Sequence, residues 1–494
     1  MKIGSTIPCI VRVCVTAGVV CGLSAVPRAG ASDGAVIRLY DRDLPLVVRA
    51  AAGADPADEA SLQRAYDHAR LLENRVDVTR ADTIGCRILR DGLRRIAQAA
   101  VGVADGFDRR DPGQVRTSRS ALAAGRRRVA VVVRDCRVPS RRGAPLPPAV
   151  VLTEPVPHAV AAGSVRVVLP PGADAGEVRI DGQVVGALAV HGGGGTARLP
   201  DGAGRHSVSV GLSRGGRAVA TATSDDVWIM PAGWRVPAGT QRSDGHLDAA
   251  LRRAAGALDG VGAAWVRDVG SGRTGGWNAE ARFPAASTVK LAVMIEAARR
   301  AGRAPDRSPF AADVRAIGAR SSNLAANRLL PLVGGTASVQ RRLTAMGAAR
   351  STFPAAYRVA TARLPDPVAP PIVSRRVTTA ADLGRVLTVL YDSSLGDAGA
   401  RRRSGLTSRQ ARFVLGALLA SERRGDNAGV LGGMSADRLA AQKNGWIRSV
   451  RHTAAIVDTP RGPVVVVALT WSPVMTAARA RRFGSRVLAV VDVM

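Results

Sequence analysis

The sequence predicts a multidomain protein in which a small helical domain and an all-β domain precede a larger α/β (α+β) domain with an antiparallel sheet. From about Pro56 to Val138, apolar residues recur at three- and four-residue steps, which is typical of amphipathic helices. From about Ala149 to Met230, short alternating runs are separated by Gly, Asp and Pro, as in an all-β domain. Over residues 244–494, strand patterns occur at both ends and helical patterns between them.

Length and composition allow two or three domains with apolar cores. The chain has 494 residues, of which 46% are hydrophobic and only 3% aromatic, so mainly Ala, Val and Leu must fill the cores. The formal net charge of +31 would suit an anionic polymer. The arginines are spread along the chain, however, without zinc-finger spacing or an aromatic-studded basic strand. We therefore expect no nucleic-acid partner and interpret the charge as solvated surface, with contact to an anionic cell-envelope polymer as the alternative.

Residues 1–31 have the pattern of a secretory signal peptide. Lys2 and Arg12 come early, the apolar segment VCVTAGVVCGLSAV follows, and Ala29–Ala31 is a small-x-small cleavage site. No other segment is long and apolar enough to span a bilayer. We expect cleavage near Ala31 and an extracytoplasmic protein, in the periplasm, in the cell envelope or secreted, with no transmembrane anchor in the mature chain.

Cysteine usage predicts one disulfide in the mature protein. Of the five cysteines, Cys9, Cys14 and Cys21 leave with the signal peptide, and Cys86 and Cys136 remain. An even pair in an oxidising compartment favours a disulfide, with two buried free thiols as the alternative. Neither cysteine has a second cysteine or a histidine at ligand spacing, so we expect no metal site.

The two N-terminal domains contain no motif that indicates chemistry. Residues 32–138 are predicted to form three antiparallel helices, with Gly106 as a stop signal in the second. Residues 149–230 are predicted to form a small sandwich of immunoglobulin type, which would space or dock a neighbour or, alternatively, bind carbohydrate. By composition, 139–148 and 231–245 are linkers.

The C-terminal domain, residues 244–494, begins and ends with a helix. A hairpin turning at Ser271–Gly275 follows the first helix, and three strands within 441–472 precede the last, with a turn at Thr459–Gly462. These strands from both ends are expected to form one antiparallel sheet against which the terminal helices pack. A helical lobe would be inserted between the two halves.

A serine and a lysine at the start of the predicted central helix form a candidate catalytic pair. Ser287 and Lys290 are three residues apart, so they can share a helix face. Only three lysines occur among the 70 basic residues, and Lys2 lies in the expected signal peptide, which leaves Lys290 and Lys443. A buried Lys can become neutral and act as a base, whereas Arg cannot. The alternative is a solvated Lys beside a capping Ser.

Three motifs occur in order: Ser287-x-x-Lys290, Ser321-Ser322-Asn323 and Lys443-Asn444-Gly445. This set resembles the S-x-x-K, S-D-N and K-T-G motifs of the serine β-lactamases and penicillin-binding proteins. The flanks FPAASTVKLAV, NLAANRLL and VRHTAAIV resemble class A β-lactamases in particular. The resemblance covers about residues 246–494 and implies the serine β-lactamase/transpeptidase-like fold for them.

The resemblance implies roles in acyl transfer for several side chains. Ser287 would be the acylated nucleophile and Lys290 its general base or proton relay. Ser321 would carry the proton to the leaving nitrogen, although it could also be a helix N-cap. Backbone N–H groups of Ser287 and of Trp446, which follows Gly445, would form the oxyanion hole.

Other residues are implied to hold the substrate or support the site. Asn323 would hold the amide side chain of the substrate, and Asn327 would brace the wall of the site. Lys443 would supply positive charge for the substrate carboxylate. For His452, a carboxylate-binding role and a structural role in a strand are both open.

The chain departs from the class A pattern at four points. The second motif reads S-S-N and the third K-N-G, and both changes keep a hydrogen-bonding side chain. The shorter interval from Ser287 to Ser321 implies a trimmed lobe and a more open site. The loop before Val377 lacks the glutamate that would activate the deacylating water, and Asp366 is its only acid and the candidate replacement.

The predicted function is that of a secreted serine hydrolase acting through an acyl-serine intermediate, without a cofactor. The first expectation is hydrolysis of a β-lactam amide. One alternative is a D-alanyl-D-alanine carboxypeptidase or transpeptidase acting on cell-wall peptides, which slow deacylation would favour. The other is a non-catalytic envelope-binding protein, but such a protein would have no reason to keep Ser287, Lys290, Ser321 and Lys443.

Overall fold

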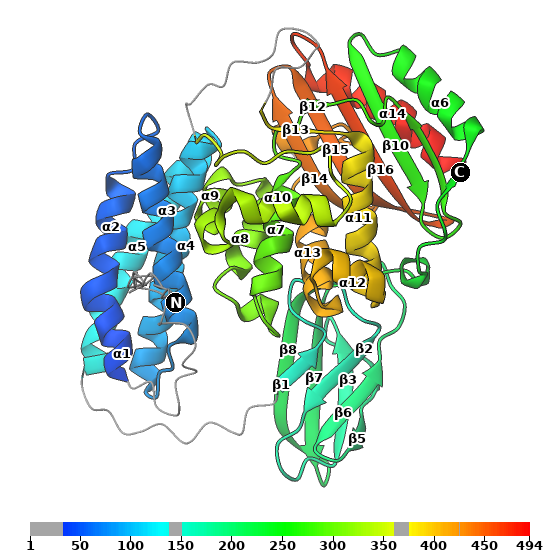
Figure 1. Cartoon of the computed structure of the whole chain (residues 1–494). Coiled ribbons are helices and arrows are strands. Elements are labelled where there is room, and N and C mark those ends of the chain that lie inside the picture. The colour runs from blue at the N-terminus through cyan, green and yellow to red at the C-terminus, as the bar shows by residue number, and fades with distance from the viewer. Residues whose placement is uncertain (1–32, 138–150, 360–374, 424) are drawn as a thin grey trace, which may run out of the picture.

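Three bodies follow one another along the chain: a bundle of helices, two small β-sheets, and a larger domain that combines a sheet with helices (Figure 1). The expected signal peptide and the linker at 139–148 lie outside the described residues, and both stay predictions. The computed structural model describes residues 33–137, 151–359, 375–423 and 425–494.

The first body, residues 33–137, is called the helical region here. Its elements are α1 (Asp33–Arg38), the π-turn η1 (Leu39–Asp43), α2 (Leu44–Ala52), α3 (Glu59–Val78), α4 (Ile84–Asp108) and α5 (Pro112–Arg137). The three long helices correspond to the three expected from the sequence, and α1 to α2 form a further segment packed on them. The expected stop at Gly106 is wrong by two residues. Gly106 instead lets α5 approach, because a Cβ there would lie 2.8 Å from the Val115 side chain.

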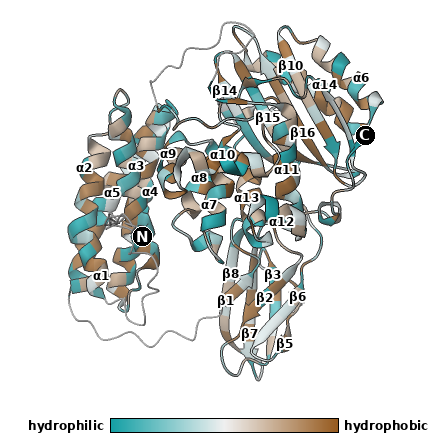
Figure 2. Cartoon of the chain, viewed as in Figure 1, coloured by the Kyte–Doolittle hydropathy of each residue, from teal (hydrophilic) through white to brown (hydrophobic). Residues whose placement is uncertain are grey.

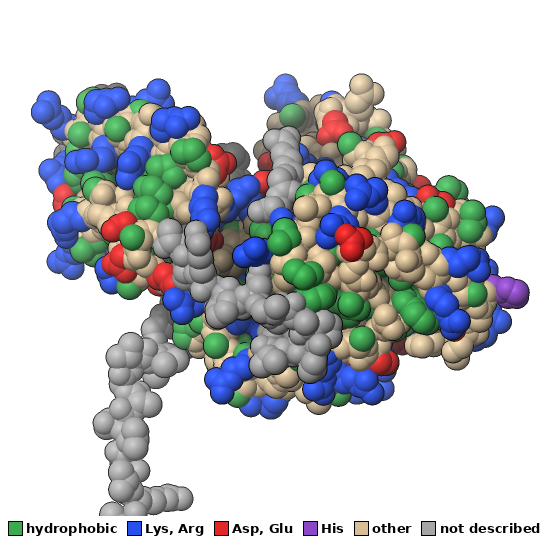
Figure 3. Space-filling model, turned by 90° about the horizontal axis from the view of Figure 1, so that it is seen from above, with side chains coloured by type: hydrophobic (Ala, Val, Ile, Leu, Met, Phe, Trp, Pro, Cys, Tyr) green, Lys and Arg blue, Asp and Glu red, His purple; other side chains and the backbone are tan. Residues whose placement is uncertain are grey.

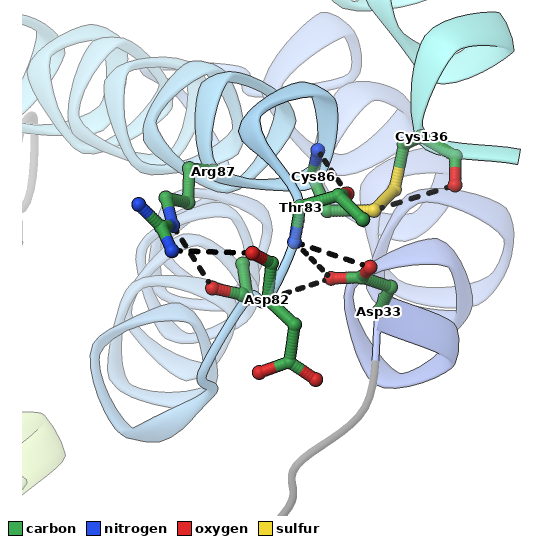
Figure 4. The surroundings of a disulfide bond; sticks show 7 residues. Asp33, Asp82, Thr83, Cys86, Arg87 and Cys136 are labelled. Carbon is green, nitrogen blue, oxygen red and sulfur yellow. Dashed lines mark hydrogen bonds between the residues drawn. A yellow bond between two sulfur atoms is a disulfide. The ribbon is translucent and has the colours of Figure 1, made fainter. Parts of the chain in front are cut away.

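A disulfide joins Cys86 in the first turn of α4 to Cys136 in the last turn of α5, the pair expected from the sequence (Figure 4). The carboxylate of Asp33 accepts the N–H groups of Asp82 and Thr83, so the start of α1 is held beside the same end of the bundle. The bond closes a segment of 50 residues. Restricting the unfolded chain in this way stabilises the folded region by about 4 kcal/mol.

The second body, residues 151–230, is called the β region. Its strands are β1 (Val151–Glu154), β2 (Ser164–Val168), β3 (Ala175–Ile180), β4 (Gln183–Ala187), β5 (Ala189–His191), β6 (Gly194–Arg198), β7 (Gly204–Arg214) and β8 (Arg217–Ile229). They form two antiparallel sheets, in the orders β1-β2-β6-β5 and β4-β3-β7-β8. Buried Val165, Val178 and Val210 from the two sheets pack in one core, as in a sandwich. Its immunoglobulin type stays a prediction.

The segment 231–245, expected to be a linker, is folded onto the C-terminal domain. It contains the 3₁₀ turn η2 (Ala232–Arg235) and the strand β9 (Arg242–Ser243). Trp234 is buried, donates its indole N–H to Asp458 at 2.7 Å and packs against the ring of Tyr391. A buried aromatic anchor therefore fixes this end of the β region.

The C-terminal domain is built on a six-stranded sheet in the order β14-β15-β16-β10-β11-β9. Its further strands are β10 (Val261–Asp268), β11 (Arg273–Trp277), β14 (Ala440–Ile447), β15 (Val450–Thr459) and β16 (Gly462–Trp471). As expected, strands from both ends of the domain pair, because β10 lies antiparallel to β16. The pairing is antiparallel throughout except between β9 and β11. Hydrophobic residues run along β15 and β16, which lie in the middle of the sheet (Figure 2).

Helices cover both faces of this sheet. The terminal helices α6 (Gly245–Gly256) and α14 (Ala477–Asp492) share one core with it, and α11 (Ala380–Leu395) and α13 (Ser408–Leu419) pack on the other side (Figure 1). The inserted lobe contributes most of the remaining elements: β12 (Phe283–Pro284), α7 (Lys290–Arg300), η3 (Pro305–Arg307), α8 (Ala311–Arg320), α9 (Asn323–Leu332), α10 (Gly335–Ala345), β13 (Val377–Thr378), α12 (Ala398–Ser404) and η4 (Gly425–Ala428).

Side-chain caps explain where several of these helices begin. Each cap accepts a backbone N–H that the first turn of a helix leaves without a partner. The cap of α13 is a reciprocal box in which Thr407 and Gln410 each bond to the backbone of the other. The other caps include Asp58 at α3, Thr83 at α4, Asp244 at α6 and Thr379 at α11.

The helical region docks on the inserted lobe through buried polar contacts. The hydroxyl of Tyr66 on α3 donates to Asp313 on α8 at 2.9 Å, and both side chains are fully buried. Gln63 donates to the carbonyl of Leu324 on α9 at 3.2 Å. The apolar core of the helical region is continuous with that of the lobe. The helical region and the lobe therefore form one packed unit.

The distribution of basic side chains and the lengths of the helices bear on the questions of a polyanionic partner and of a membrane anchor. On the face that Figure 3 shows, Lys and Arg side chains are scattered over the helical region and the C-terminal domain rather than gathered in one patch. This scatter fits the interpretation of the charge as solvated surface. Within the described ranges, we find no helix that is both long enough and apolar enough to cross a membrane.

Candidate active site

Ser287 lies in a tight turn between β12 and α7. Ala286 before it has φ 47°, a left-handed conformation, and Thr288 ties the turn by donating its hydroxyl to Ala285 O at 2.7 Å. Gly445 on β14 approaches this turn closely, because a Cβ on it would lie 3.0 Å from Ser287 N. A larger residue at 445 would push the strand away from the turn. The two backbone segments expected to form the oxyanion hole therefore lie together, and half-buried Trp446 follows Gly445 on the strand.

Lys290 is fully buried at the first position of α7. Its Nζ donates to Ser321 O and to Asn323 Oδ1, both at 2.5 Å, and lies 4.4 Å from the centre of the Tyr357 ring. Burial lowers the pKa of Lys290 to about 7, against the opposing charge of Asp108. Lys290 can therefore be a neutral base near pH 7.

Ser287 and Lys290 do not meet in the way that their spacing suggested. Among the contacts of the described residues, no hydrogen bond joins the Ser287 hydroxyl to Lys290, since Nζ points to Ser321 O and Asn323 Oδ1. Catalytic hydrogen bonds are often long without substrate and tighten in the complex. In the absence of substrate, the hydrogen-bond partners of Lys290 Nζ therefore belong to the S-S-N segment.

Ser321 lies between Lys290 and Lys443. Its hydroxyl accepts Lys443 Nζ at 2.6 Å, and its carbonyl accepts Lys290 Nζ. Its backbone is left-handed, with φ 59° and ψ 31°, and it caps the C-terminal end of α8. The alternative of a helix N-cap belongs to the next residue, because Ser322 accepts the Ala325 N–H of α9 at 3.2 Å.

Lys443 reaches the site from β14 and is almost completely buried. Besides Ser321, its Nζ donates to Asn444 O at 2.8 Å. Burial lowers the pKa of Lys443 well below its usual range, and the charge of Lys290 lowers it further. Two buried ammonium groups on one serine repel each other, so the pair loses a proton more readily than an isolated lysine does.

Asn327, expected as a brace, and Asn323, expected to hold the substrate, both bond to backbone groups beside Lys290. Asn327 holds the Tyr357 backbone with two bonds of 2.7 Å, one to its carbonyl and one from its N–H. Asn323 Nδ2 donates to Arg358 O at 2.9 Å. The Tyr357 hydroxyl donates to Ala286 O at 3.3 Å, and burial raises the pKa of Tyr357 to about 12. Sequence reasoning missed Tyr357, although the chain has only four tyrosines.

Asn444, the middle residue of the K-N-G motif, has a structural role. Its amide donates to Asn427 O at 2.6 Å and accepts the Thr453 hydroxyl at 2.7 Å. These bonds connect β14 to η4 and β15. Asn444 therefore braces the strand that carries Lys443 and Gly445.

His452 has a structural environment. It is fully buried, with Nε2 2.8 Å from Pro284 O and Nδ1 accepting the Thr470 N–H at 3.2 Å. Burial lowers the pKa of His452 to about 4, against the opposing effect of its contacts with the carbonyls of Pro284 and Arg451. Of the two roles left open, the geometry supports the strand residue with a satisfied imidazole.

Two acids of the helical region lie at the site, where the sequence indicated no chemistry in that region. Asp105 on α4 accepts Arg320 Nη2 at 2.9 Å and the Ser322 hydroxyl at 3.0 Å. Asp108, at the end of α4, lies 3.5 Å from Asn323 Nδ2. The sequence could not predict this role of Asp105 and Asp108, because neither residue is near one of the three motifs. Asp366, the candidate deacylation acid, lies outside the described residues.

The comparisons with known proteins concern the C-terminal half. The model of the Beta-lactamase enzyme family matches residues 246–305 and 313–489. No protein with a curated function matches the sequence.

Solved structures similar to this chain include "Structure of PBP-A", with 16% identity over 52% of this chain and 100% of that chain, at a TM-score of 0.42. A beta-lactamase from Sphaerobacter thermophilus is 23% identical over 51% of this chain and 97% of that one, at a TM-score of 0.40. A beta lactamase from Xanthomonas campestris is 20% identical over 50% and 97%, at a TM-score of 0.38.

The family match begins and ends within the domain that carries the three motifs. It includes the strands at both ends of the domain, and all the expected site residues from Ser287 to Trp446 lie within its span. Residues 246–489 are therefore similar to the beta-lactamase enzyme family, in agreement with the order of the three motifs.

Proposed function

We propose that the C-terminal domain is a serine hydrolase that forms an acyl-Ser287 intermediate, with a β-lactam amide as its substrate. The observation that carries this proposal is the convergence of Lys290 and Lys443 on Ser321, beside the Ser287 turn. Both lysines are buried, and burial lowers the pKa of each. Acyl transfer from an amide requires a neutral amine that can take the proton of the nucleophilic hydroxyl, and a lysine with a lowered pKa can supply it.

The acylation step uses these groups in sequence. Neutral Lys290 takes the proton of the Ser287 hydroxyl while Oγ attacks the carbonyl carbon. The backbone N–H groups of Ser287 and Trp446 hold the developing oxyanion. The C–N bond then breaks, and the Ser321 hydroxyl delivers a proton to the leaving nitrogen and regains one from Lys443 or Lys290. A substrate carboxylate next to Lys443 would favour the protonated form of its amine, and the resulting charge would hold the substrate.

The second candidate is a D-alanyl-D-alanine carboxypeptidase or transpeptidase that forms the acyl-Ser287 intermediate with the same residues. One observation favours it: the Tyr357 ring lies over Lys290 Nζ, and Nζ donates hydrogen bonds to Ser321 O and Asn323 Oδ1. An acyl-enzyme that no carboxylate base helps to hydrolyse would persist, which is the behaviour of this second candidate. Asp366 remains the proposed deacylation acid of the β-lactamase reaction.

Export is part of the proposal. The charged start, apolar segment and cleavage site of residues 1–31 support it. A disulfide between Cys86 and Cys136 is also of the kind found in oxidising compartments. Both substrate classes occur outside the cytoplasm, where an exported enzyme would meet them.

One experiment separates these functions. The mature protein and its Ser287→Ala variant are incubated with a chromogenic β-lactam, and absorbance and intact mass are followed together. We expect Ser287-dependent turnover. An adduct that persists without turnover would favour the penicillin-binding candidate. The absence of any Ser287-dependent adduct would exclude both and favour a non-catalytic binding protein.

A further inference from the structure

We propose that Asp105, on α4 of the helical region, is a positioning residue of the active site. It holds the two residues that flank Ser321 and thereby fixes the backbone of Ser321 between the two lysines. The helical region would then be a working part of the active site. The catalytic consequence rests on the proposed function, whereas the effect on the Ser321 backbone does not.

The geometry of Asp105 is that of a two-armed clamp. Oδ2 accepts Arg320 Nη2 at 2.9 Å, and Oδ1 accepts the Ser322 hydroxyl at 3.0 Å. These are the residues directly before and after Ser321. The Asp105 side chain is 1% exposed, so water does not compete for either bond. Hydrogen bonds to a charged carboxylate are stronger than those between neutral groups.

Ser321 needs such a clamp because its backbone conformation is unfavourable. With φ 59° and ψ 31°, it lies in the left-handed region that residues other than glycine rarely adopt. This conformation directs its carbonyl to Lys290 and its hydroxyl to Lys443. The surroundings must therefore hold Ser321 in place, and Asp105 bonds to the side chains on both sides of it.

The sequence of the motif points the same way. The related motif reads S-D-N, whereas this chain has Ser322 in the middle. The Ser322 hydroxyl does two things at once: it accepts the Ala325 N–H as the cap of α9 and donates to Asp105. The carboxylate that the motif lacks is thus supplied by a helix more than 200 residues earlier in the chain.

The helical region is held firmly enough to act as a clamp. Tyr66 bonds to buried Asp313 on α8, and Gln63 bonds to the backbone of α9. A third contact joins Glu59 at the start of α3 to Arg358 at 2.9 Å. These contacts come from α3 and lie on both sides of the S-S-N segment, and α4 packs against α3.

Electrostatics gives Asp105 a second measurable effect. The negative charges of Asp108 and Asp105 raise the pKa of Lys290 against the larger lowering by burial. Removing the charge of Asp105 should therefore lower the pKa of Lys290. A residue that only stabilised the fold would not shift the pH dependence of acylation.

The test uses four variants of the full mature chain. Asp105→Asn removes the charge at nearly constant size. Ser322→Asp adds a carboxylate to the motif itself while keeping a good helix cap. The double variant combines both changes and moves the carboxylate from α4 to the motif. Tyr66→Phe is the matched control, because it removes a buried hydrogen bond of the same interface away from Ser321.

Two readouts are measured for each variant beside its melting temperature. The first is amide hydrogen exchange over residues 318–326, followed by mass spectrometry. For Asp105→Asn we expect exchange there to rise about tenfold, since local opening becomes easier. The second is the rate of Ser287 acylation against pH. We expect a loss of about 10²-fold, the size of effect that a displaced catalytic group produces, and a shift of the rising limb to lower pH.

The three other variants make the test specific. Ser322→Asp alone should also raise exchange and slow acylation, because it sets two carboxylates against each other. In the double variant, the single remaining carboxylate should restore most of both properties. Tyr66→Phe should lower the melting temperature while leaving exchange at 318–326 and the pH profile unchanged.

The outcomes separate this proposal from the proposed function. Unchanged exchange at 318–326 in Asp105→Asn would overturn the clamp, whatever the activity. The same holds if Tyr66→Phe reproduces its exchange pattern. Altered exchange that the double variant restores, in a protein that no β-lactam acylates, would support the clamp and contradict the proposed hydrolase.

Discussion

The helical region and the β region both contact the C-terminal domain, but in different ways. The helical region brings charged and polar groups to the S-S-N segment, with Asp105 bonded to Arg320 and Ser322. The β region contacts α13 instead, where Val160 N–H donates to Arg412 O at 3.1 Å and Arg412 pairs with Glu154 at 3.0 Å. None of these residues of the β region bonds to an expected catalytic residue.

This difference teaches that two accessory regions of one chain can have unequal roles. The contact of the β region is close, since a Cβ on Gly416 of α13 would lie 2.2 Å from His158 O. A close contact away from the site fits a spacer or docking element. Buried charges at the site fit a part of the catalytic machinery. The following predictions compare the two regions, from the largest expected effect to the smallest.

Replacing Lys290 by Arg should give the largest loss of acylation rate, against which the effects of changes in the two accessory regions can be judged. Arg keeps the positive charge but cannot release its proton, so acylation of Ser287 should fall by about 10³–10⁴-fold, near the upper end of what general base catalysis contributes. Intact-mass kinetics with a chromogenic β-lactam measures the rate. If Lys290→Arg is still acylated at the normal rate, another group takes the proton, and the inference from the scarcity of lysine is wrong.

Removing the disulfide should weaken the helical region selectively. The double variant Cys86→Ser/Cys136→Ser frees a segment of 50 residues, and the unfolding free energy of that region should fall by about 4 kcal/mol. Urea unfolding followed by helical circular dichroism measures this change. Acylation should then fail at the urea concentration that unfolds the helical region. Full acylation after that region has unfolded would show that the site does not depend on it.

Glu154→Gln tests the β region in the same way. The side chains of Glu154 and Arg412 are 15% and 14% exposed. Loss of the charge leaves Arg412 buried without its partner, at a cost of about 3 kcal/mol to the docking of the β region. Faster limited proteolysis of residues 151–230 would report the weaker docking. The acylation rate should stay unchanged, and a clear loss of activity would remove the contrast between the two regions.

The pH dependence of acylation gives the smallest effect. Because the pKa of Lys290 is lowered to about 7 and the neutral form is the base, the rate should fall about tenfold per pH unit below 7 and level off above it. Asp108 raises this pKa, so Asp108→Asn should shift the limb to lower pH. Stopped-flow acylation between pH 5 and 9 measures both profiles. Glu154→Gln is the control, and a shift of its limb would count against this interpretation.

Much of the C-terminal domain could be predicted because its signals are local. Alternation in β14 to β16, the turn at Thr459–Gly462 and the helix at the chain end all follow from short-range patterns. Ser287, Lys290, Ser321 and Lys443 were identified from motif order and from the scarcity of lysine. Close packing then brings the last three together, as the resemblance implied.

The rest depended on contacts between distant segments. Ser322, not Ser321, is the helix cap, because the left-handed turn at Ser321 ends one helix before the next begins. Tyr357 covers Lys290 only because Asn327 holds its backbone from another helix. Neither feature has a periodic or motif-like signal in the sequence.

By itself, the sequence determined the order of the three bodies, the pair of cysteines and the candidate nucleophile with its two lysines. These depend on periodicity, composition and motif spacing, which are properties of neighbouring residues. Only the tertiary structure decided that Asp105 of α4 lies against Arg320 and Ser322. A buried carboxylate is stable only where donors surround it, and those donors come together only when two distant parts of the chain pack.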